Sequence, residues 1–292
     1  MIRHILLLSA CFFLLEGTSC TDISRKTRPD KSQVSDTTTA NIILMRYEYN
    51  YIYLDGIVND SIPMSVKFDT GAYGFTISNT LKPEFQDKLP VTLKIGSYQH
   101  IFNNIKYSGA TFFNAMKRNL GKDGILLGWD FFENKVIEMS YNKQYIKVLE
   151  NTLDLTSHDC IELILKGTDF IVPISIHMQN RLYHVHLVLD TGLDETLVTC
   201  REFVPGLNYS DAYKGSGKGM NNIINKLDAM NADSLKIGNN TLKNITIGIF
   251  EKNIFTYGNP PTKYEGLLGN KFLDNFSVVL DFKNKKLYLK PI

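Results

Sequence analysis

Hydrophobic and polar residues alternate along most of the chain in short runs, as they do in β-strands with one buried face. Runs over 161–165, 170–176 and 183–189 are rich in Val, Ile and aromatic residues and are separated by Gly, Asn or Pro. Helical periodicity is scarce, and we expect only short helical turns over 129–134 and 270–275. The pattern therefore predicts an all-β protein.

Three sequence motifs occur twice in the same order, which indicates an internal duplication. The paired motifs, first half before second half, are VKFDTG (66–71) and LVLDTG (187–192), LKIG (93–96) and LKIG (235–238), and LLGWDFFEN (126–134) and LLGNKFLDN (267–275). Each LKIG segment leads into alternating residues and predicts a hairpin. We place the seam near 150–158 and predict two homologous lobes, 41–150 and 151–292.

The two halves differ mainly by one insertion. The chain from Asp-Thr-Gly to Lys-Ile-Gly is 21 residues longer in the second half than in the first. The excess includes residues 209–222. Within it, glycine occupies every second position from 215 to 219, at Gly215, Gly217 and Gly219. Glycine at this density favours a mobile or sharply bent hairpin.

The first residues have the pattern of an export signal. Arg3 and His4 precede an apolar run over 5–15, which is shorter than the about 20 residues that a bilayer-spanning helix needs. Small residues then lead to Cys20, as in bacterial lipoprotein signals, where this cysteine carries the lipid. An ordinary cleaved signal peptide is the alternative. We expect a lipoprotein signal peptide over 1–20 and a disordered, polar tether over 21–40.

Charge and cysteine content limit the partners. With 32 basic and 30 acidic residues the formal net charge is +2, and no basic cluster points to nucleic acid. Cys11 lies in the expected signal peptide and Cys20 would carry the lipid, so Cys160 and Cys200 are the two cysteines that remain. An exported chain permits a disulfide between them, and two reduced, buried cysteines are the alternative.

Three histidines lie close together in the sequence, at His177, His184 and His186. His184 and His186 share one face of a predicted strand, but no further ligands have the spacing of a metal site. We therefore expect neither a metal nor another cofactor.

An apolar strand that ends in Asp-Thr-Gly and is followed downstream by two aliphatic residues and a glycine resembles the aspartic peptidase superfamily of pepsins and retroviral proteases. A single Asp-Thr-Gly motif is weak evidence for this family, because it arises by chance with a frequency on the order of 10⁻⁴ per position. Two copies at equivalent places in a repeat are specific. The resemblance covers residues from about 41 to 292 and is closer to duplicated, retropepsin-like bacterial proteases. It implies a bilobal pepsin-like or retropepsin-like fold of two β-barrel-like lobes with the active site between them.

Asp69 and Asp190 would form the catalytic pair. Two carboxylates held about 3 Å apart share one proton, because both cannot ionise cheaply. The charged partner takes a proton from a water between them, and the protonated partner donates a hydrogen bond to the peptide carbonyl. The pair titrates as a unit, so neither residue is assigned as acid or base.

Neighbouring residues would support this pair. Glycine after each Asp-Thr lets backbone N–H groups approach the carboxylates, and the resemblance implies that the two threonines interlock and that the two Leu-Leu-Gly segments brace the loops. These supporting residues are Thr70, Gly71, Thr191, Gly192, Gly128 and Gly269.

The chain departs from the pepsin pattern at two places. Ser or Thr usually follows Asp-Thr-Gly, whereas Ala72 and Leu193 stand here. The spacing also leaves room for a flap only in the second half. The expected flap residues are Tyr213, Gly215, Gly217 and Gly219.

These features predict an aspartic endopeptidase that acts on peptides or proteins. Because one chain supplies both aspartates, we expect a monomer. We expect it to be lipid-anchored in the bacterial cell envelope, on a membrane face that the sequence leaves open. The alternative is a catalytically inactive peptide-binding lipoprotein that has kept the fold.

Overall fold

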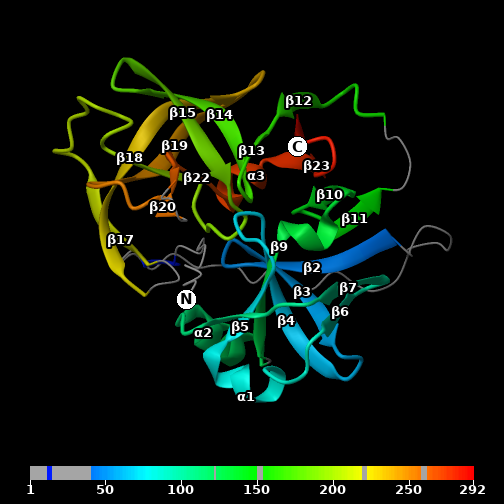
Figure 1. Cartoon of the computed structure of the whole chain (residues 1–292). Helices are drawn as coiled ribbons and strands as arrows, with labels where there is room; N and C mark the ends of the chain where they lie inside the picture. Colours follow the sequence, from blue (N-terminus) through cyan, green and yellow to red (C-terminus); the bar gives the residue numbers. More distant parts are fainter. Residues whose placement is uncertain (1–11, 15–40, 122, 150–153, 219–221, 258–261) are drawn as a thin grey trace.

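The fold is described here from a computed structural model of the chain. The described residues are 12–14, 41–121, 123–149, 154–218, 222–257 and 262–292. Most of its regular structure is strand, gathered into two large sheets (Figure 1), so the all-β prediction is confirmed. Residues 150–153 of the expected seam, the tether, Cys20 and Gly219 lie outside the described residues.

The larger sheet has thirteen strands and contains the whole first half together with three strands of the second. Its first-half strands are β2 (Ile42–Glu48), β3 (Tyr51–Val58), β4 (Ile62–Asp69), β5 (Phe75–Ser78), β6 (Val91–Ile95), β7 (Tyr98–Phe102), β8 (Lys106–Ser108), β9 (Gly124–Gly128), β10 (Val136–Ser140) and β11 (Tyr145–Leu149). Its second-half strands are β12 (Asp159–Glu162), β23 (Phe276–Asp281) and β24 (Lys286–Pro291). Because β10 pairs with β23, the closing hairpins of the two halves form one continuous sheet.

The second sheet has nine strands, eight of which come from the second half. Its strands are β1 (Phe12–Leu14), β13 (Ile164–Lys166), β14 (Asp169–Met178), β15 (Arg181–Leu189), β16 (Leu197–Cys200), β17 (Tyr213–Lys218), β18 (Ile224–Ile237), β19 (Asn240–Phe250) and β22 (Gly266–Leu268). A separate two-stranded sheet joins β20 (Thr256–Tyr257) and β21 (Thr262–Lys263). The predicted insertion includes β17. β1 pairs antiparallel with the outer edge of β17.

The sequence repeat is also a repeat of topology. In the first half β4 runs parallel to β9, and in the second half β15 runs parallel to β22. The next strand, β5 or β16, then pairs antiparallel with the same neighbour. Gly96 and Gly238 turn the predicted hairpins β6–β7 and β18–β19 with φ of 59° and 55°, which glycine adopts readily.

Within the described residues the helical segments are short. These are η2 (Asn79–Leu81), α1 (Lys82–Phe85), α2 (Phe112–Leu120), η3 (Trp129–Phe132) and α3 (Asn270–Leu273). The expected turns after each Leu-Leu-Gly correspond to η3 and α3. The longer α2 was not expected; it buries Phe112, Phe113 and Met116 on one side and ends at Gly121. No helix in the described part of the chain is long and apolar enough to cross a membrane.

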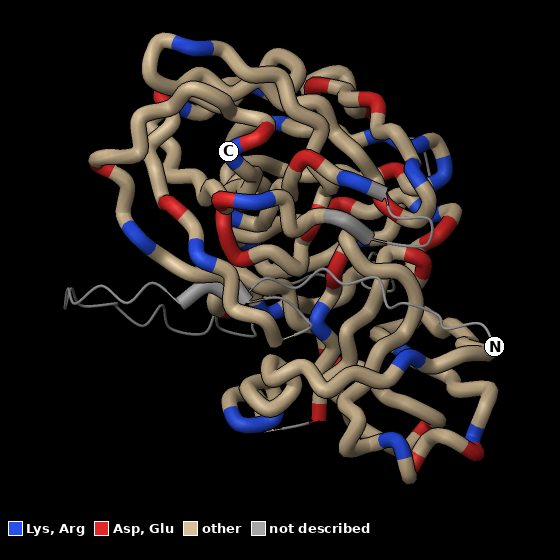
Figure 2. Tube along the Cα trace, turned by 60° about the vertical axis from the view of Figure 1, so that its left-hand side comes forward, with Lys and Arg blue, Asp and Glu red and all other residues tan. Residues whose placement is uncertain are grey.

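The two halves share one hydrophobic core. Trp129 packs against Phe170 and Phe282 of the second half, with ring centroids 4.7 and 5.7 Å apart. Its indole N–H donates to the carbonyl of Thr168 at 2.8 Å. Lysine, arginine, aspartate and glutamate are spread along the trace with both signs mixed (Figure 2). Apolar packing therefore holds the halves together in addition to the pairing of β10 with β23.

Cys160 and Cys200 are both free, so the structure contains no disulfide between them. Cys200 is buried, as the reduced alternative expects, whereas Cys160 is exposed on β12.

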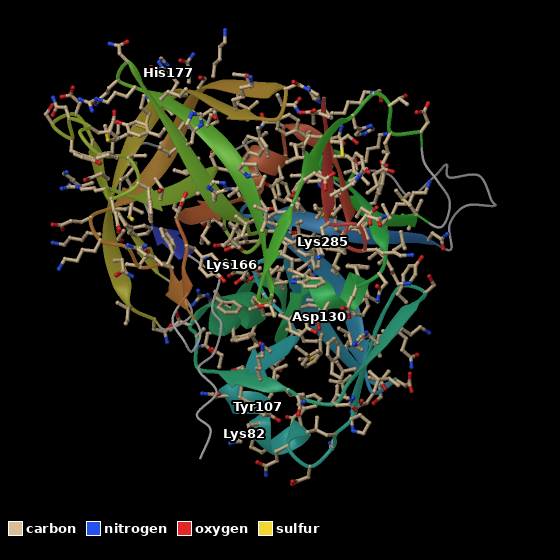
Figure 3. The ribbon with its side chains drawn as sticks, turned by 45° about the horizontal axis from the view of Figure 1, so that its top comes forward. Lys82, Tyr107, Asp130, Lys166, His177 and Lys285 are labelled. Atoms are coloured by element: carbon tan, nitrogen blue, oxygen red, sulfur yellow. The ribbon has the colours of Figure 1, made fainter. Side chains whose placement is uncertain are left out.

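The three histidines have separate partners. His177, labelled in Figure 3, lies 3.3 Å from Asp233, and His184 shares a hydrogen bond of 3.0 Å with Ser175. His186 lies 3.7 Å from Glu265. Among the described residues no group of three His, Cys, Asp or Glu side chains is placed to hold a metal ion.

Candidate active site

The two Asp-Thr-Gly turns meet in the interior, and both aspartates are fully buried. Asp69 ends β4, and Asp190 directly follows β15. In each turn the glycine N–H donates to the Oδ1 atom of its aspartate, at 2.9 Å for Asp69 and 2.7 Å for Asp190. A methyl group on Gly192 would collide with the Asp69 carboxyl and come within 2.8 Å of Asp190 Oδ1. The glycine is therefore what allows the two carboxyls to approach.

The two threonines bond to each other across the halves. The Thr70 N–H donates to the Thr191 hydroxyl at 2.9 Å, and the Thr191 N–H donates to the Thr70 hydroxyl at 3.0 Å. Each hydroxyl in turn donates to a strand carbonyl of the opposite half, Thr70 to Leu189 and Thr191 to Phe68. These four bonds hold the turns in fixed relative positions.

Each Leu-Leu-Gly segment contacts the loop that follows its aspartate. The Gly128 N–H donates to the Gly74 carbonyl at 2.9 Å, and the Gly269 N–H donates to the Thr196 carbonyl at 2.9 Å. A methyl group on Gly128 would approach the Ala72 carbonyl to 2.6 Å. Only glycine permits this approach, so the two glycines brace the loops by backbone contact.

The electrostatic environment favours a proton on the aspartate pair. Burial raises the pKa of Asp190 well above its usual range, and the charge of Asp69 and a hydrogen bond with it raise that pKa further. The Lys67 ammonium and the Gly192 N–H act in the opposite direction. A pair with these opposing influences can hold one proton while carrying one negative charge.

Asn270 supports the second turn, and its role was not predicted. Its buried side-chain amide donates to the Thr191 carbonyl at 2.6 Å and to the Asn50 carbonyl at 2.8 Å, and it accepts a hydrogen bond from Tyr141. It occupies the position after the second Leu-Leu-Gly, where the first half has Trp129. The sequence signal for this role was a polar residue, Asn270, directly after the apolar Leu-Leu-Gly segment.

Lys67 and Asp194 were also missed. Lys67 lies two residues before Asp69, so both side chains project from the same face of β4. The lysine is only 1% exposed, and its Nζ donates to the Gly192 carbonyl at 3.1 Å. Asp194 lies in the loop after Asp190. A lysine inside a buried strand breaks the apolar pattern and was the signal that sequence reasoning passed over.

The glycine-rich hairpin crosses from the second half to the first. In Figure 1 the yellow strands β17 and β18 extend toward α2. Asn222, just before β18, contacts the start of α2. Its side chain accepts from the Thr111 N–H at 2.9 Å and donates to the Gly109 carbonyl at 3.0 Å. Tyr213 is exposed, and Gly215 lines a small cavity with Glu195. The hairpin thus spans from the loop after Asp190 to the start of α2.

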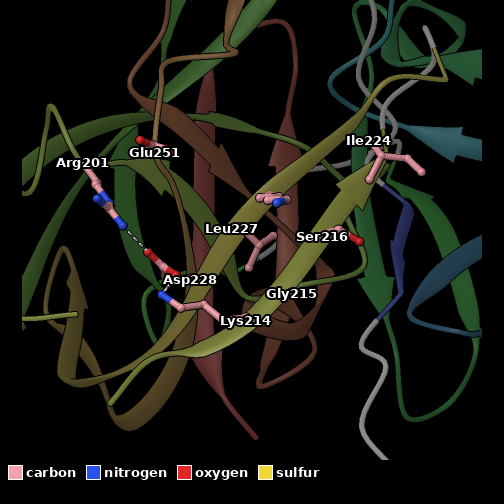
Figure 4. Close-up of a pocket in the computed structure, with 9 residues that line it drawn as sticks. Arg201, Lys214, Gly215, Ser216, Ile224, Leu227, Asp228 and Glu251 are labelled. Atoms are coloured by element: carbon pink, nitrogen blue, oxygen red, sulfur yellow. Dashed lines mark hydrogen bonds and ion pairs between the residues drawn. The ribbon is translucent and has the colours of Figure 1, made fainter. Parts of the chain in front are cut away.

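A cavity at the hairpin is lined by residues other than the aspartates. It has a volume of about 660 Å³, and Arg201, Lys214 and Asp228 form an ion-pair cluster in it (Figure 4). Asp228 contacts Arg201 and Lys214 at 2.6 Å each. The Lys214–Asp228 pair joins the two hairpin strands, and the Arg201–Asp228 pair links the hairpin to the residue after β16.

Comparisons with known proteins support the fold. No family model matches the chain, and no curated protein matches it in sequence. Among solved structures, the crystal structure of an aspartic proteinase from Irpex lacteus is similar, with a TM-score of 0.52 and 12% sequence identity. The match covers 86% of this chain and 96% of that one. The chain therefore has the bilobal, all-β fold of a pepsin-like aspartic proteinase.

Proposed function

We propose that this protein is an aspartic endopeptidase that cleaves peptide bonds with a water activated between Asp69 and Asp190. The observation that carries the proposal is the meeting of two buried carboxyls from two halves, each held by the N–H of the glycine two residues on. Such a pair supplies both a general base and a general acid. Thr70, Thr191 and the braced loops keep the carboxyls in place.

The reaction would use the pair in its singly protonated form. The ionised carboxyl removes a proton from water, and the resulting hydroxide attacks the peptide carbon. The protonated carboxyl donates to the carbonyl oxygen as the C=O bond opens. As the tetrahedral species collapses and the C–N bond breaks, the carboxyl that took the proton from water gives it to the amine. The other carboxyl takes back its proton from a hydroxyl of the tetrahedral carbon as the C=O bond re-forms, which restores the singly protonated pair. The raised pKa of Asp190 favours retention of the shared proton at weakly acidic pH.

The test is cleavage of a peptide library across pH 3–8 by the protein from residue 21 onward. Asp69→Asn and Asp190→Asn each remove one ionisable carboxyl and leave the shape of the side chain almost unchanged. We expect both variants to lose turnover while circular dichroism and the melting temperature stay close to those of the parent. Near-normal turnover in either variant would show that the pair is not catalytic.

A second candidate is an inactive peptide-binding protein with the same fold. The pairing of β17 with β1, a segment of the expected signal peptide, favours it, because the edge of β17 accommodates an extended segment there. Leu193, which is fully buried where pepsins carry a hydroxyl, also favours it. Peptide binding by the parent without cleavage at any pH would support this candidate over the first.

We further propose that the protein is exported and lipid-anchored through Cys20 in a bacterial cell envelope. The support is the basic start, the apolar run and the small residues before the cysteine. Labelling with a fatty-acid analogue, lost in Cys20→Ser, tests the anchor. Because one chain carries both aspartates, the proposed active form is a monomer. Activity per molecule should then stay constant on dilution.

A further inference from the structure

A cavity of about 420 Å³ is lined by residues of both halves, and the two aspartates are not among them. Its apolar lining includes Tyr49, Phe112 and Met116, and its polar lining includes Lys67 and Asp194. Lys67 shares a strand face with Asp69, and Asp194 follows Asp190 by four residues. A peptide held for cleavage at the pair would therefore place a side chain in this cavity.

The Lys67 ammonium lies at the boundary between the cavity and the catalytic pair. It contacts the Gly192 carbonyl at 3.1 Å and lies 3.5 Å from the centre of the Tyr51 ring. The Phe112 ring centre is 5.4 Å away. The aromatic walls and the surrounding strands keep this charge away from bulk water, which strengthens its effect on a group that enters the cavity.

Asp194 adds a second polar group to the same cavity. Its Oδ1 atom is buried and has no hydrogen-bond partner among the described residues. Burial raises the pKa of Asp194 to about 7, although the Lys67 charge and a hydrogen bond with Tyr51 oppose the shift. Below that pH the carboxyl is mostly protonated and can donate a hydrogen bond, so Asp194 and Lys67 both present donors.

The remaining charged groups around the cavity leave an excess of positive charge. Glu195 is paired with Lys271 at 2.8 Å, and Arg118 of α2 also lines the cavity. With Asp194 protonated, the lining carries three basic groups and one acidic group. A basic substrate side chain would be repelled, and an apolar one would leave the buried Asp194 oxygen without a partner.

We propose that this cavity binds an acidic side chain of the peptide substrate, with Lys67 as the residue that selects it. The carboxylate would lie between the Lys67 ammonium and the Asp194 carboxyl, and the aliphatic stem would lie against Tyr49, Phe112 and Met116. The inference rests on the proposed endopeptidase function and specifies its substrate class. It also gives a role to a buried lysine that the catalytic steps do not use.

The experiment compares four matched peptides that differ only in having Glu, Gln, Leu or Lys at one position beside the scissile bond. For the parent protein at pH 5.5 we expect kcat/KM for Glu to exceed that for Gln by about tenfold, with Lys the poorest. Lys67→Met keeps the length of the side chain and removes its charge, and it should bring the Glu-to-Gln ratio close to one. Lys94→Met, on the exposed side of β6, is the control and should leave the ratio unchanged.

A second variant covers the possibility that Lys67→Met does not fold. In the parent, the preference for the Glu peptide should decline above pH 7, because Asp194 ionises and can no longer donate a hydrogen bond. The amide of Asp194→Asn stays a donor, so this variant should keep the preference up to pH 8.5. The titratable groups that interact with Asp194 are Tyr47, Tyr51, Tyr53, Lys67 and Glu195. Tyr49, Arg118 and Lys271 also line the cavity. A parent that cleaves all four peptides equally well would overturn the inference and leave the proposed function intact.

The inference also has a test that does not require cleavage. Fluorescence anisotropy with labelled forms of the same peptides measures binding to the Asp69→Asn protein. Tighter binding of the Glu peptide, lost in Asp69→Asn/Lys67→Met, supports the inference even if the parent is inactive. Equal affinity for the four peptides would exclude it, whatever the outcome for catalysis.

Discussion

Thr70 and Thr191 exchange backbone-to-hydroxyl hydrogen bonds of 2.9 and 3.0 Å across the two halves of the chain. Both residues are fully buried, so water does not compete for these bonds. Each hydroxyl accepts from the opposite N–H and donates to a strand carbonyl of the opposite half. The relative position of the two aspartates therefore depends directly on two side-chain hydroxyls.

Replacing Thr70 by valine should weaken the fold as well as the site. Valine has nearly the same shape, but it leaves the Thr191 N–H and the Leu189 carbonyl buried without that partner. Each unsatisfied group costs about 1–3 kcal/mol, so we expect the loss of both partners to lower the free energy of unfolding by about 2–6 kcal/mol. Urea denaturation measures this. Thr70→Ser keeps the hydroxyl and should lose less than half as much; equal losses in both variants would refute the role given to the hydrogen bonds.

Much of this arrangement could be predicted from the repeat, because three motifs in the same order identify equivalent turns. The placement of Thr70, Gly71, Gly128 and their second-half counterparts follows from backbone approaches that only certain residues allow. Lys67 and Asn270 could not be placed in the same way. Their contacts, to the carbonyls of Gly192 and Thr191, join segments more than 70 residues apart, and one half of the repeat lacks the equivalent residue.

The hairpin contact at Asn222 should control access to the site. Asn222 has φ of 61° and two hydrogen bonds to the start of α2. Asn222→Gly removes both bonds without straining the backbone. We expect faster amide exchange in β17 and, if the proposed function holds, a several-fold higher KM. Asn180→Gly changes an asparagine of similar φ in the β14–β15 turn and should affect neither quantity. Unchanged exchange in Asn222→Gly would show that the contact does not hold the hairpin.

Asp169 should make the fold less stable as the pH rises. Burial raises its pKa to about 6, and the Asp190 charge adds to the shift, although a hydrogen bond from Tyr264 opposes it. The folded state therefore holds the proton more tightly than the unfolded state, whose pKa is near 3.8. The contribution of protonated Asp169 to the free energy of unfolding is fully present below pH 3.8. It is lost as the pH rises through about 6, the pKa of Asp169 in the folded state.

Asp169→Asn removes this dependence and can still accept the hydrogen bond from Tyr264. The free energy of unfolding of the variant minus that of the parent should therefore be about 1–3 kcal/mol larger at pH 8 than at pH 4, given about 1.4 kcal/mol for each pKa unit. Chemical denaturation at both pH values gives the difference. A constant difference between variant and parent would mean that Asp169 has an ordinary pKa in the folded protein.

The acidic limb of the rate profile should lie nearer to neutral pH than that of gastric pepsin. Activity requires one ionised carboxyl, and both burial and the neighbouring Asp69 raise the pKa of Asp190. Ala72 and Leu193 provide no hydroxyl that would stabilise the charged form. In Ala72→Ser a hydroxyl next to the first turn can donate to Asp69, which favours ionisation. The limb should therefore move to lower pH, by up to about one unit. The measurement is kcat/KM against pH for the parent, Ala72→Ser and Ala72→Gly, the last of which changes the side chain without adding a donor. A parent optimum at pH 2–3, or an equal shift in both variants, would contradict this account of the site.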